Sequence, residues 1–378
     1  MRVMGLTSEQ EAARSAFREF VEREIVEQAD VFDREEKMPV ALIRKLANEG
    51  YLGAMLSKAW GGGGMDIVTY GLLNEEIGRG CSSVRSLITV HNMVCQVISR
   101  WGTSRQQEHW LPGLACGQKI AAFGLSEPNV GSDARQVETL ATLAGDSYVL
   151  NGEKKWITFG EVANLFLIFA RSADGPCAFL VTRETPGLST KLMTGLLGVR
   201  ASMLAEVHLD ECRISKENLI GGVGFGSSHV AAAALNHGRY SVAWGCVGIA
   251  RACLEACLRY TSERKQFGSL LKDHQLIRRM ISNMVTNLKA ARLLCLEAGY
   301  LMDAKDPGAV AETFIAKYFA SGAAAGTARD AVQIHGANGC SSDYRVGRYF
   351  RDAKIMEIIE GSDEIQQLTI AEHAYCGF

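Results

Sequence analysis

The chain has 378 residues, enough for two or three domains with a large buried core. Its 40 basic and 42 acidic side chains give a net charge of −2 without a long block of one sign, which argues against a nucleic acid or a membrane surface as partner. No apolar run approaches the roughly 18 to 20 residues of a membrane span. The start, Met1–Leu6, leads into a polar helix rather than a signal sequence, so we expect a soluble, cytoplasmic protein.

The eleven cysteines are scattered from Cys81 to Cys376. They form no Cys-x-x-Cys pair, and no histidines stand near them at metal-binding spacing. This pattern predicts reduced thiols and no metal site.

The first region, 1–119, has a helical period. Thr7 and Gln10 have the spacing of a capping box. A buried stripe is predicted by the three- and four-residue spacing of Phe17, Phe20, Val21 and Ile25. We therefore expect an all-α domain here.

The second region, 120–222, changes to a period of two. Short β-rich runs at 147–150, 166–169, 178–181 and 206–209 are separated by Gly-, Asn- and Pro-containing turns. This pattern predicts an antiparallel β domain.

The third region, 223–378, returns to the helical period, in segments at about 227–261, 274–304 and 307–332. Small residues on the first and third segments favour close packing, and we expect a four-helix bundle. The α, β, α order argues against a doubly wound dinucleotide fold, and no strand precedes a Gly-x-Gly-x-x-Gly motif.

Two segments of the β region could face a polar planar ring or a phosphate. The loop Phe123–Asp133 carries hydroxyls and amides in a turn imposed by Pro128 and Gly131, although an ordinary loop would look the same. Trp156 and Thr158 stand two apart and would lie on one side of a strand, although Trp156 could equally be a core residue.

A candidate general base is Glu360, which follows Ile358 and Ile359 and precedes Gly361. Apolar neighbours desolvate a carboxylate and raise its pKa toward neutrality, as a general base requires. The alternative is a solvated acid at a helix end, with Ser362 as N-cap.

Taken in order, these segments resemble the flavin-dependent acyl-CoA dehydrogenase family. The resemblance covers nearly the whole chain. It includes four further motifs: Arg264-Lys265-Gln266-Phe267-Gly268, Asp273-His274-Gln275, Gln333-Ile334-His335-Gly336 and Arg351-Asp352-Ala353-Lys354. It implies an acyl-CoA dehydrogenase-like fold of class α+β and FAD as cofactor.

The resemblance also implies which residues contact FAD. In this family the adenosine half of FAD crosses a subunit boundary, which implies a homotetramer or a dimer. Trp156 would back the isoalloxazine and Thr158 would bond near its reactive N5, while Ser362 and Glu364 would contact FAD near the base. The pyrimidine side and pyrophosphate would be lined by Phe123, Leu125, Ser126, Gly131 and Ser132. A neighbouring protomer's flavin would be served by Arg264, Phe267, Gln275, Gln333 and Gly336.

Glu360 matches the usual base of this family. Some relatives place the acid on an earlier helix, just before the arginine that matches Arg239, and here that position is Gly238. By resemblance, Glu360 would remove the α-hydrogen as a proton while the β-hydrogen leaves as hydride to the flavin. A backbone amide near Glu360 would help to hold the substrate carbonyl. The implied substrate contacts here are Ser132, Arg239 and Gly361.

A closer resemblance is to the branch that serves hydroxymalonyl and methoxymalonyl extender-unit pathways of polyketide biosynthesis. It is carried by three runs, 81–86, 238–249 and 351–362. Members are proposed to oxidise a short oxygenated acyl group on an acyl carrier protein. Such a substrate suits the polar residues of the region that lines the acyl pocket in relatives, namely Ser82, Ser83, Arg85, His91 and Asn92.

Two other functions stay open. One is a catabolic short- or branched-chain acyl-CoA dehydrogenase that passes electrons to an electron-transferring flavoprotein, which His91-Asn92-Met93 and Gly361-Ser362-Asp363-Glu364 also resemble. The other is a flavoprotein scaffold without chemistry, against which an intact Glu360 argues.

Overall fold

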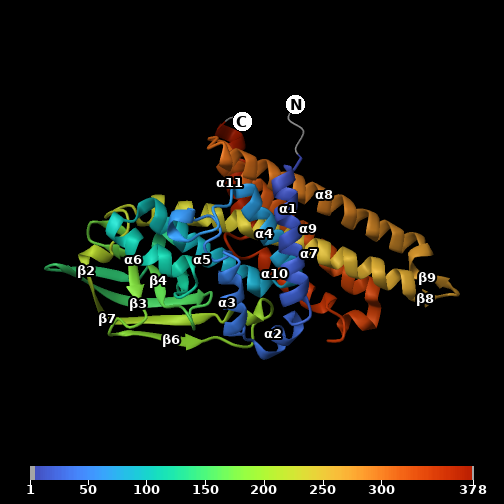
Figure 1. Ribbon diagram of the computed structural model, residues 1–378, viewed down its shortest axis with the longest axis horizontal. Coiled ribbons are helices and arrows are strands. Elements are labelled where there is room, and N and C mark those ends of the chain that lie inside the picture. The colour runs from blue at the N-terminus through green and yellow to red at the C-terminus, as the bar shows by residue number, and fades with distance from the viewer. Residues whose placement is uncertain (1–4, 377–378) are drawn as a thin grey trace.

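The computed structural model describes residues 5–376, so most of the segment expected to start the chain, Met1–Leu6, lies outside the described residues. A helical region, a β-sheet and a second helical region follow one another along the chain (Figure 1). This order confirms the predicted α+β fold class.

The N-terminal region packs its helices around a shared apolar core. The predicted capping box is confirmed: the Thr7 hydroxyl accepts from the Gln10 amide at 3.2 Å, and the Gln10 side chain accepts from the Thr7 amide at 3.1 Å. The helices are α1 (Ser8–Val21), α2 (Ala29–Glu35), α3 (Val40–Asn48), α4 (Ile67–Gly80), α5 (Ser82–Trp101) and α6 (Ser104–Ala115).

The middle region forms a seven-stranded sheet in which the order is β1-β4-β2-β3-β7-β6, with β5 paired to β4. The four predicted β-rich runs lie on β3, β4, β5 and β7. The strands are β1 (Ala121–Gly124), β2 (Leu140–Ala144), β3 (Ser147–Ile157), β4 (Leu165–Ser172), β5 (Gly175–Thr182), β6 (Leu188–Leu192) and β7 (Ala205–Ser215).

The sheet is mixed, so the prediction of an antiparallel sheet is wrong for two pairs of strands. β1 pairs in parallel with β4, from Ala121 opposite Leu165 to Gly124 opposite Ile168, and β2 also meets β4 in parallel, with Leu140 opposite Arg171. A parallel pair needs a long connection, and the flavin-loop candidate together with the β2–β3 hairpin supplies one. The loop after β1 therefore follows a strand at one end of the sheet that lies parallel to its neighbour, rather than one arm of a hairpin.

The C-terminal region is built on three long helices that match the predicted segments within a few residues. A short hairpin protrudes at the end of the molecule opposite the sheet (Figure 1). The helices are α7 (Ala232–Glu263), α8 (Gln275–Asp303), α9 (Ala309–His335), α10 (Val346–Met356) and α11 (Asp363–Cys376), and the hairpin strands are β8 (Lys265–Gln266) and β9 (Ser269–Leu270).

Small residues let α7 lie close to α4. A Cβ added at Gly78 would stand 2.9 Å from the Gly245 Cα, nearer than real Cβ atoms approach. The helix Gly226–Glu263, which includes α7, is long and apolar enough to cross a membrane by length and composition, which the sequence analysis did not anticipate. Because 78% of its most apolar window is buried inside the protein, it is a core helix.

Candidate active site

Glu360 lies in the turn between α10 and α11, with a left-handed backbone φ of 55°. Its Oε2 is buried and has no hydrogen-bond partner within residues 5–376. Burial raises the pKa of this carboxyl to about 7, against the opposing effect of the Arg239, Arg85 and Lys317 cations. Glu360 is half-buried as a residue and its Oε2 is buried, which argues against the alternative of a solvated acid.

Gly238 on α7 faces this carboxyl group. A Cβ at position 238 would lie 2.4 Å from Glu360 Oε2 and 2.9 Å from Met93 Sδ. Any side chain at this position would displace the acid. The carboxyl group of Glu360 thus fills the space in which a side chain of residue 238 would lie.

The backbone around Glu360 is held by a side chain that the sequence analysis missed. Gln366 on α11 is fully buried, and its Nε2 donates to the carbonyls of Glu360 at 3.1 Å and Gly361 at 2.9 Å. The amide of Glu360 itself has no partner among the described residues, so it can bind an added carbonyl oxygen.

A cavity of about 1420 Å³ is bounded by residues of all three regions. Glu360 does not line it, but Arg239 does, and its Nε would lie 3.7 Å from a Cβ added at Gly361. The Arg239 guanidinium is 4.3 Å from the Phe314 ring centroid, and Ser132 lines the cavity from the β region. Burial lowers the pKa of Arg239. Four buried polar atoms around this cavity lack a partner in the described chain: Trp101 Nε1, Asn236 Oδ1, His237 Nδ1 and Arg239 Nε. The cavity thus offers several unused groups to a polar ligand.

The Phe123–Asp133 loop is fixed by a buried ion pair. Lys154 Nζ lies 2.6 Å from Glu127 Oε1, and both side chains are almost completely buried. Glu127 also accepts from the amide and hydroxyl of Thr139 at 2.9 and 2.6 Å. Burial lowers the pKa of Lys154 to about 8, against the effect of Glu127, whereas the bonds from Lys154 and Thr139 hold the pKa of Glu127 low despite its burial. Beyond this anchor, Gly131 and Ser132 are exposed.

The flavin-facing candidates of the β region lie around this anchored loop. Leu125 is buried, while Phe123 and Ser126 are partly exposed, and the Ser126 carbonyl accepts from the Lys155 amide at 2.9 Å. Trp156 is 52% exposed, so the alternative of a core tryptophan is wrong.

The prediction that Trp156 and Thr158 lie on one side of the same strand is wrong. Trp156 has a φ of 64°, the β3–β7 register shifts between Lys154 and Ile157, and Thr158 lies beyond the end of β3. The bulge turns the Trp156 indole to the surface.

The residues predicted to contact the adenosine half of FAD lie apart from the Phe123–Asp133 loop. Phe267 is 97% exposed at the tip of the β8–β9 hairpin, at the end of the molecule opposite the sheet (Figure 1). Within one chain the structure does not bring these residues to the Phe123–Asp133 loop. The exposed residues of this group are Arg264, Phe267, Gln275, Gln333 and Gly336.

Near the base, Ser362 is partly buried and Glu364 is exposed, and a hydrogen bond with Ser362 lowers the pKa of Glu364. Gly361 has a φ of 92°, and a Cβ there would stand 3.7 Å from Arg239 Nε. Gly361 and Ser362 therefore share the turn of Glu360, while Glu364 lies on the first turn of α11.

The predicted substrate-binding residues on α5 differ in whether they have a free polar group for a substrate. Ser82 is buried at the start of the helix. His91 has both ring nitrogens engaged, with Nδ1 accepting from the Ala121 amide at 3.1 Å and Nε2 donating to the Leu114 carbonyl at 3.1 Å. Burial lowers its pKa to about 4, so the ring is neutral and joins α5 to β1 rather than offering a free nitrogen.

Arg85 is a buried cation without a carboxylate partner. It is 1% exposed and donates to Thr89 Oγ1 at 2.8 Å and to Met356 Sδ at 3.6 Å, while its Nε has no partner in residues 5–376. Burial lowers its pKa, and Glu360 is one of the acids whose field opposes that effect. An unpaired buried guanidinium is costly, which indicates a use for it.

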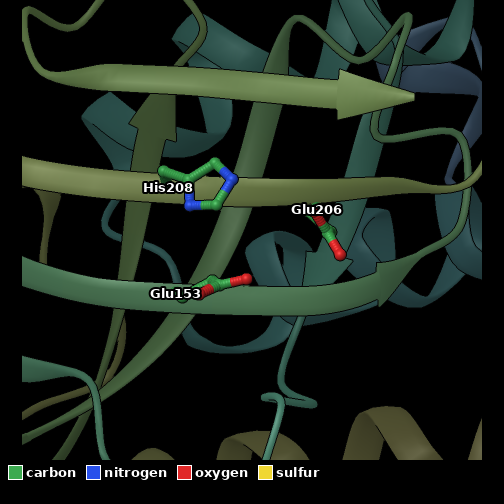
Figure 2. A group of neighbouring side chains, drawn as sticks. All are labelled: Glu153, Glu206 and His208. Carbon is green, nitrogen blue, oxygen red and sulfur yellow. The ribbon is translucent and has the colours of Figure 1, made fainter. Parts of the chain in front are cut away.

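A cluster on the sheet could hold a metal ion by geometry alone: Glu153 on β3 faces His208 and Glu206 on β7 (Figure 2). Glu206 already binds Lys155 Nζ at 3.0 Å and Lys191 Nζ at 3.4 Å. Because these lysines neutralise the acid, we assign no metal to the cluster.

Comparison with known proteins identifies the family of this chain. Family models for the N-terminal, middle and C-terminal domains of acyl-CoA dehydrogenase match residues 7–118, 122–212 and 227–375. The short-chain specific acyl-CoA dehydrogenase of Rattus norvegicus mitochondria is 39% identical over 366 residues, which cover 95% of this chain and 88% of the relative.

Two solved structures are similar over nearly the whole chain. A glutaryl-CoA dehydrogenase from Mycobacterium smegmatis in complex with FADH2 has a TM-score of 0.94 and 29% identity, covering 99% of this chain and 96% of that one. FkbI, described for biosynthesis of the methoxymalonyl extender unit of the polyketide Fk520, has a TM-score of 0.88 and 34% identity, covering 96% and 99%.

The family matches define the class of protein as an FAD-dependent oxidoreductase that acts on acyl-CoA. The chain belongs to the acyl-CoA dehydrogenase family. Its cofactor is FAD, as in the family. The residues present fit that group, since the exposed Trp156 indole offers a planar apolar face and the Phe123–Ser132 loop offers exposed amides and hydroxyls.

Proposed function

We propose that this enzyme oxidises a short, oxygenated acyl group carried on an acyl carrier protein, as a step toward a hydroxymalonyl or methoxymalonyl extender unit. The observation that carries the proposal is Arg85, a buried guanidinium without a carboxylate, on the helix that packs beside Glu360 and α7. A hydroxyl or carboxyl oxygen on the acyl group would supply its missing partner. A purely hydrocarbon acyl chain would leave it unpaired.

Glu360 contributes both its side chain and its backbone amide to this chemistry. Glu360, with its raised pKa, takes the α-proton, and the free amide of Glu360 holds the thioester carbonyl so that the α-proton becomes more acidic. Arg239 and Ser132 line the cavity through which the thioester arm reaches this point. When bound, FAD supplies the two-electron acceptor, held by the Phe123–Ser132 loop, Trp156, Thr158, Ser362 and Glu364.

A second function has its own support. The relative from Rattus norvegicus is named as a short-chain specific acyl-CoA dehydrogenase, which favours a CoA ester as substrate. An electron-transferring flavoprotein is the acceptor that the family resemblance implies for this function. FkbI, whose description names the methoxymalonyl extender unit, supports the first function at 34% identity. The two functions differ in the carrier and in the acyl group.

One experiment separates them. The purified holoenzyme is mixed anaerobically with a glyceryl-derived carrier-protein thioester and, separately, with butyryl-CoA, and bleaching of the flavin absorbance is followed. Faster bleaching by the carrier-protein thioester supports the proposal. Bleaching by the CoA ester alone overturns it in favour of the second function, whereas a purified protein without flavin absorbance would revive the non-catalytic scaffold.

We further propose a cytoplasmic homo-oligomer, a tetramer or a dimer, in which the β8–β9 hairpin serves a neighbouring protomer's flavin. The support is the exposure of Phe267 and its companions at a distance from the chain's own flavin loop. Sedimentation of the wild-type and Phe267→Ser holoenzymes, with their FAD content, tests this. Unchanged FAD content in the variant contradicts it.

A further inference from the structure

Lys317 is a buried cation on α9 that the proposed chemistry does not use. Its side chain has no exposed surface, and its Nζ lies 2.8 Å from the Gly361 carbonyl oxygen and 3.0 Å from Asp363 Oδ1. The Ser321 hydroxyl, one turn further along α9, donates to the same Asp363 oxygen at 2.7 Å. Lys317 and Ser321, both on α9, thus bind Gly361 and Asp363, which closely follow Glu360.

We propose that Lys317 and Asp363 form a positioning pair, which fastens the catalytic turn to α9 and sets the charge that Glu360 experiences. This inference rests on the proposed role of Glu360 as the base. It adds residues that do not touch the substrate but act through that acid.

The conformation of the turn explains why it needs such an anchor. Glu360 and Gly361 have consecutive positive φ angles of 55° and 92°, and the left-handed region is unfavourable for a residue with a Cβ. The buried Glu360 Oε2 has no hydrogen bond of its own, so the backbone must place the carboxyl group. Lys317 holds the carbonyl that directly follows, from a helix that cannot move separately from the core.

The charges around Glu360 come from several elements. Arg85 on α5, Arg239 on α7 and Lys317 on α9 all lower the pKa of Glu360. Within the described chain neither arginine has an ion-pair partner, whereas Lys317 has Asp363. Lys354 on α10 pairs with Glu357, the residue that directly follows this helix, at 2.9 Å. The contribution of the Lys317–Asp363 pair can therefore be changed in either direction by removing one partner.

This gives a test with opposite signs. Lys317→Met removes the cation and leaves Asp363 unpaired, so Glu360 should titrate at a higher pH. Asp363→Asn leaves Lys317 unopposed, so Glu360 should titrate at a lower pH. Each shift should be on the order of one pH unit, the usual effect of a nearby charge.

The measurement is infrared difference spectroscopy of the holoenzyme across pH, following the protonated carboxyl band that disappears in Glu360→Gln. Shifts in opposite directions in the two variants are expected. Shifts in the same direction, or an unmoved titration in variants that retain FAD and their unfolding temperature, would overturn the inference. If Lys317→Met does not fold, Asp363→Asn decides alone, and an unlowered titration overturns the inference.

The proposed function fails by a different result. Unimpaired flavin reduction in Glu360→Gln would remove Glu360 from the mechanism, whatever the infrared titration shows. If flavin reduction is slow in Glu360→Gln but the titration of Glu360 shifts in the same direction in Lys317→Met and Asp363→Asn, only the positioning role of the Lys317–Asp363 pair is excluded. Lys354→Met is the matched control, because it deletes an exposed lysine whose carboxylate partner is Glu357 rather than Asp363, and it should leave the titration in place.

Discussion

Gly238 and Glu360 face each other so closely that a single added carbon at Gly238 would lie 2.4 Å from the carboxyl oxygen of Glu360. The distance is below any normal contact, and the carboxyl group has no hydrogen bond to resist being pushed aside. The lack of a side chain at 238 is therefore part of the active-site geometry.

Gly238→Ala should slow flavin reduction at least about tenfold, because a displacement near 1 Å at the reacting group costs up to a hundredfold in rate. FAD should stay bound, since the flavin loop lies on the β region. Stopped-flow reduction and FAD content measure both effects. The matched control is Gly322→Ala on α9, where a Cβ meets nothing within 4 Å. Equal rates in the two variants would contradict the steric argument.

Glu360→Gln should retain FAD and reduce it at least about a hundredfold more slowly, the usual scale for losing a general base. The amide has the same shape as the acid but cannot accept the α-proton. The comparison variant is Glu372→Gln, an exposed acid on α11, which should reduce flavin at the wild-type rate. Normal turnover in Glu360→Gln would exclude this acid as the base.

Stability should also depend on Glu360 and on pH. The pKa of this carboxyl is about 7 in the folded protein against an ordinary value of 4.5, so the folded state binds the proton more tightly. The resulting stabilisation is complete below about pH 4.5 and is lost as the pH rises through 7, a difference of about 3 kcal/mol.

Because glutamine imitates the protonated acid, Glu360→Gln should be more stable than wild type at pH 8 by about that amount, and equal to it near pH 4. Urea unfolding at both pH values with saturating FAD measures the difference. A constant difference at the two pH values would show that the effect is packing rather than charge.

Lys154→Met should cost about 3 to 5 kcal/mol of unfolding free energy and lower the affinity for FAD, because it leaves Glu127 charged and unpaired in the interior. Adding Glu127→Gln should recover part of the loss. The matched control is Lys191→Met, whose exposed ion pair with Glu206 should be worth about 0 to 1 kcal/mol. Similar losses in the two lysine variants would argue against the anchoring role.

Arg85→Met should slow flavin reduction by an oxygenated carrier-protein thioester at least about tenfold more than reduction by butyryl-CoA, because only the first has an oxygen for the guanidinium. Any change in the pKa of Glu360 affects both substrates equally and cancels in the ratio. Stopped-flow rates with each thioester give that ratio. An unchanged ratio would assign Arg85 to structure alone.

The sequence predicted most of the fold because periodicity and turn residues are local signals. The capping box at Thr7, the β-rich runs and the three long C-terminal helices all follow from neighbouring residues. The parallel pairing of β1 with β4 did not, since strand direction depends on contacts more than 40 residues apart. The sequence also did not reveal that the helix containing α7 is long and apolar enough to cross a membrane, because its apolar character comes from small residues spread along its length.

The raised pKa of Glu360 was predictable, because its apolar neighbours stand next to it in the sequence, while its role as the base stays a prediction. The sequence did not predict the places where two polar residues form an ion pair inside the protein. Lys154 and Glu127, or Lys317 and Asp363, look like ordinary surface charges in the sequence and are buried only through the fold. His91 shows the reverse error, because the sequence does not reveal that backbone groups engage both of its ring nitrogens.

The parallel pairing of β1 with β4 has a consequence for how this protein matures. During synthesis β1 emerges first, yet its partner strand ends at Ser172, so the loop that follows β1 has no finished platform until some 50 more residues have been made. Closing so long a connection is slow compared with forming a local hairpin. Assembly of the flavin loop should therefore come late in folding of the sheet, and cofactor capture should report completion of the domain.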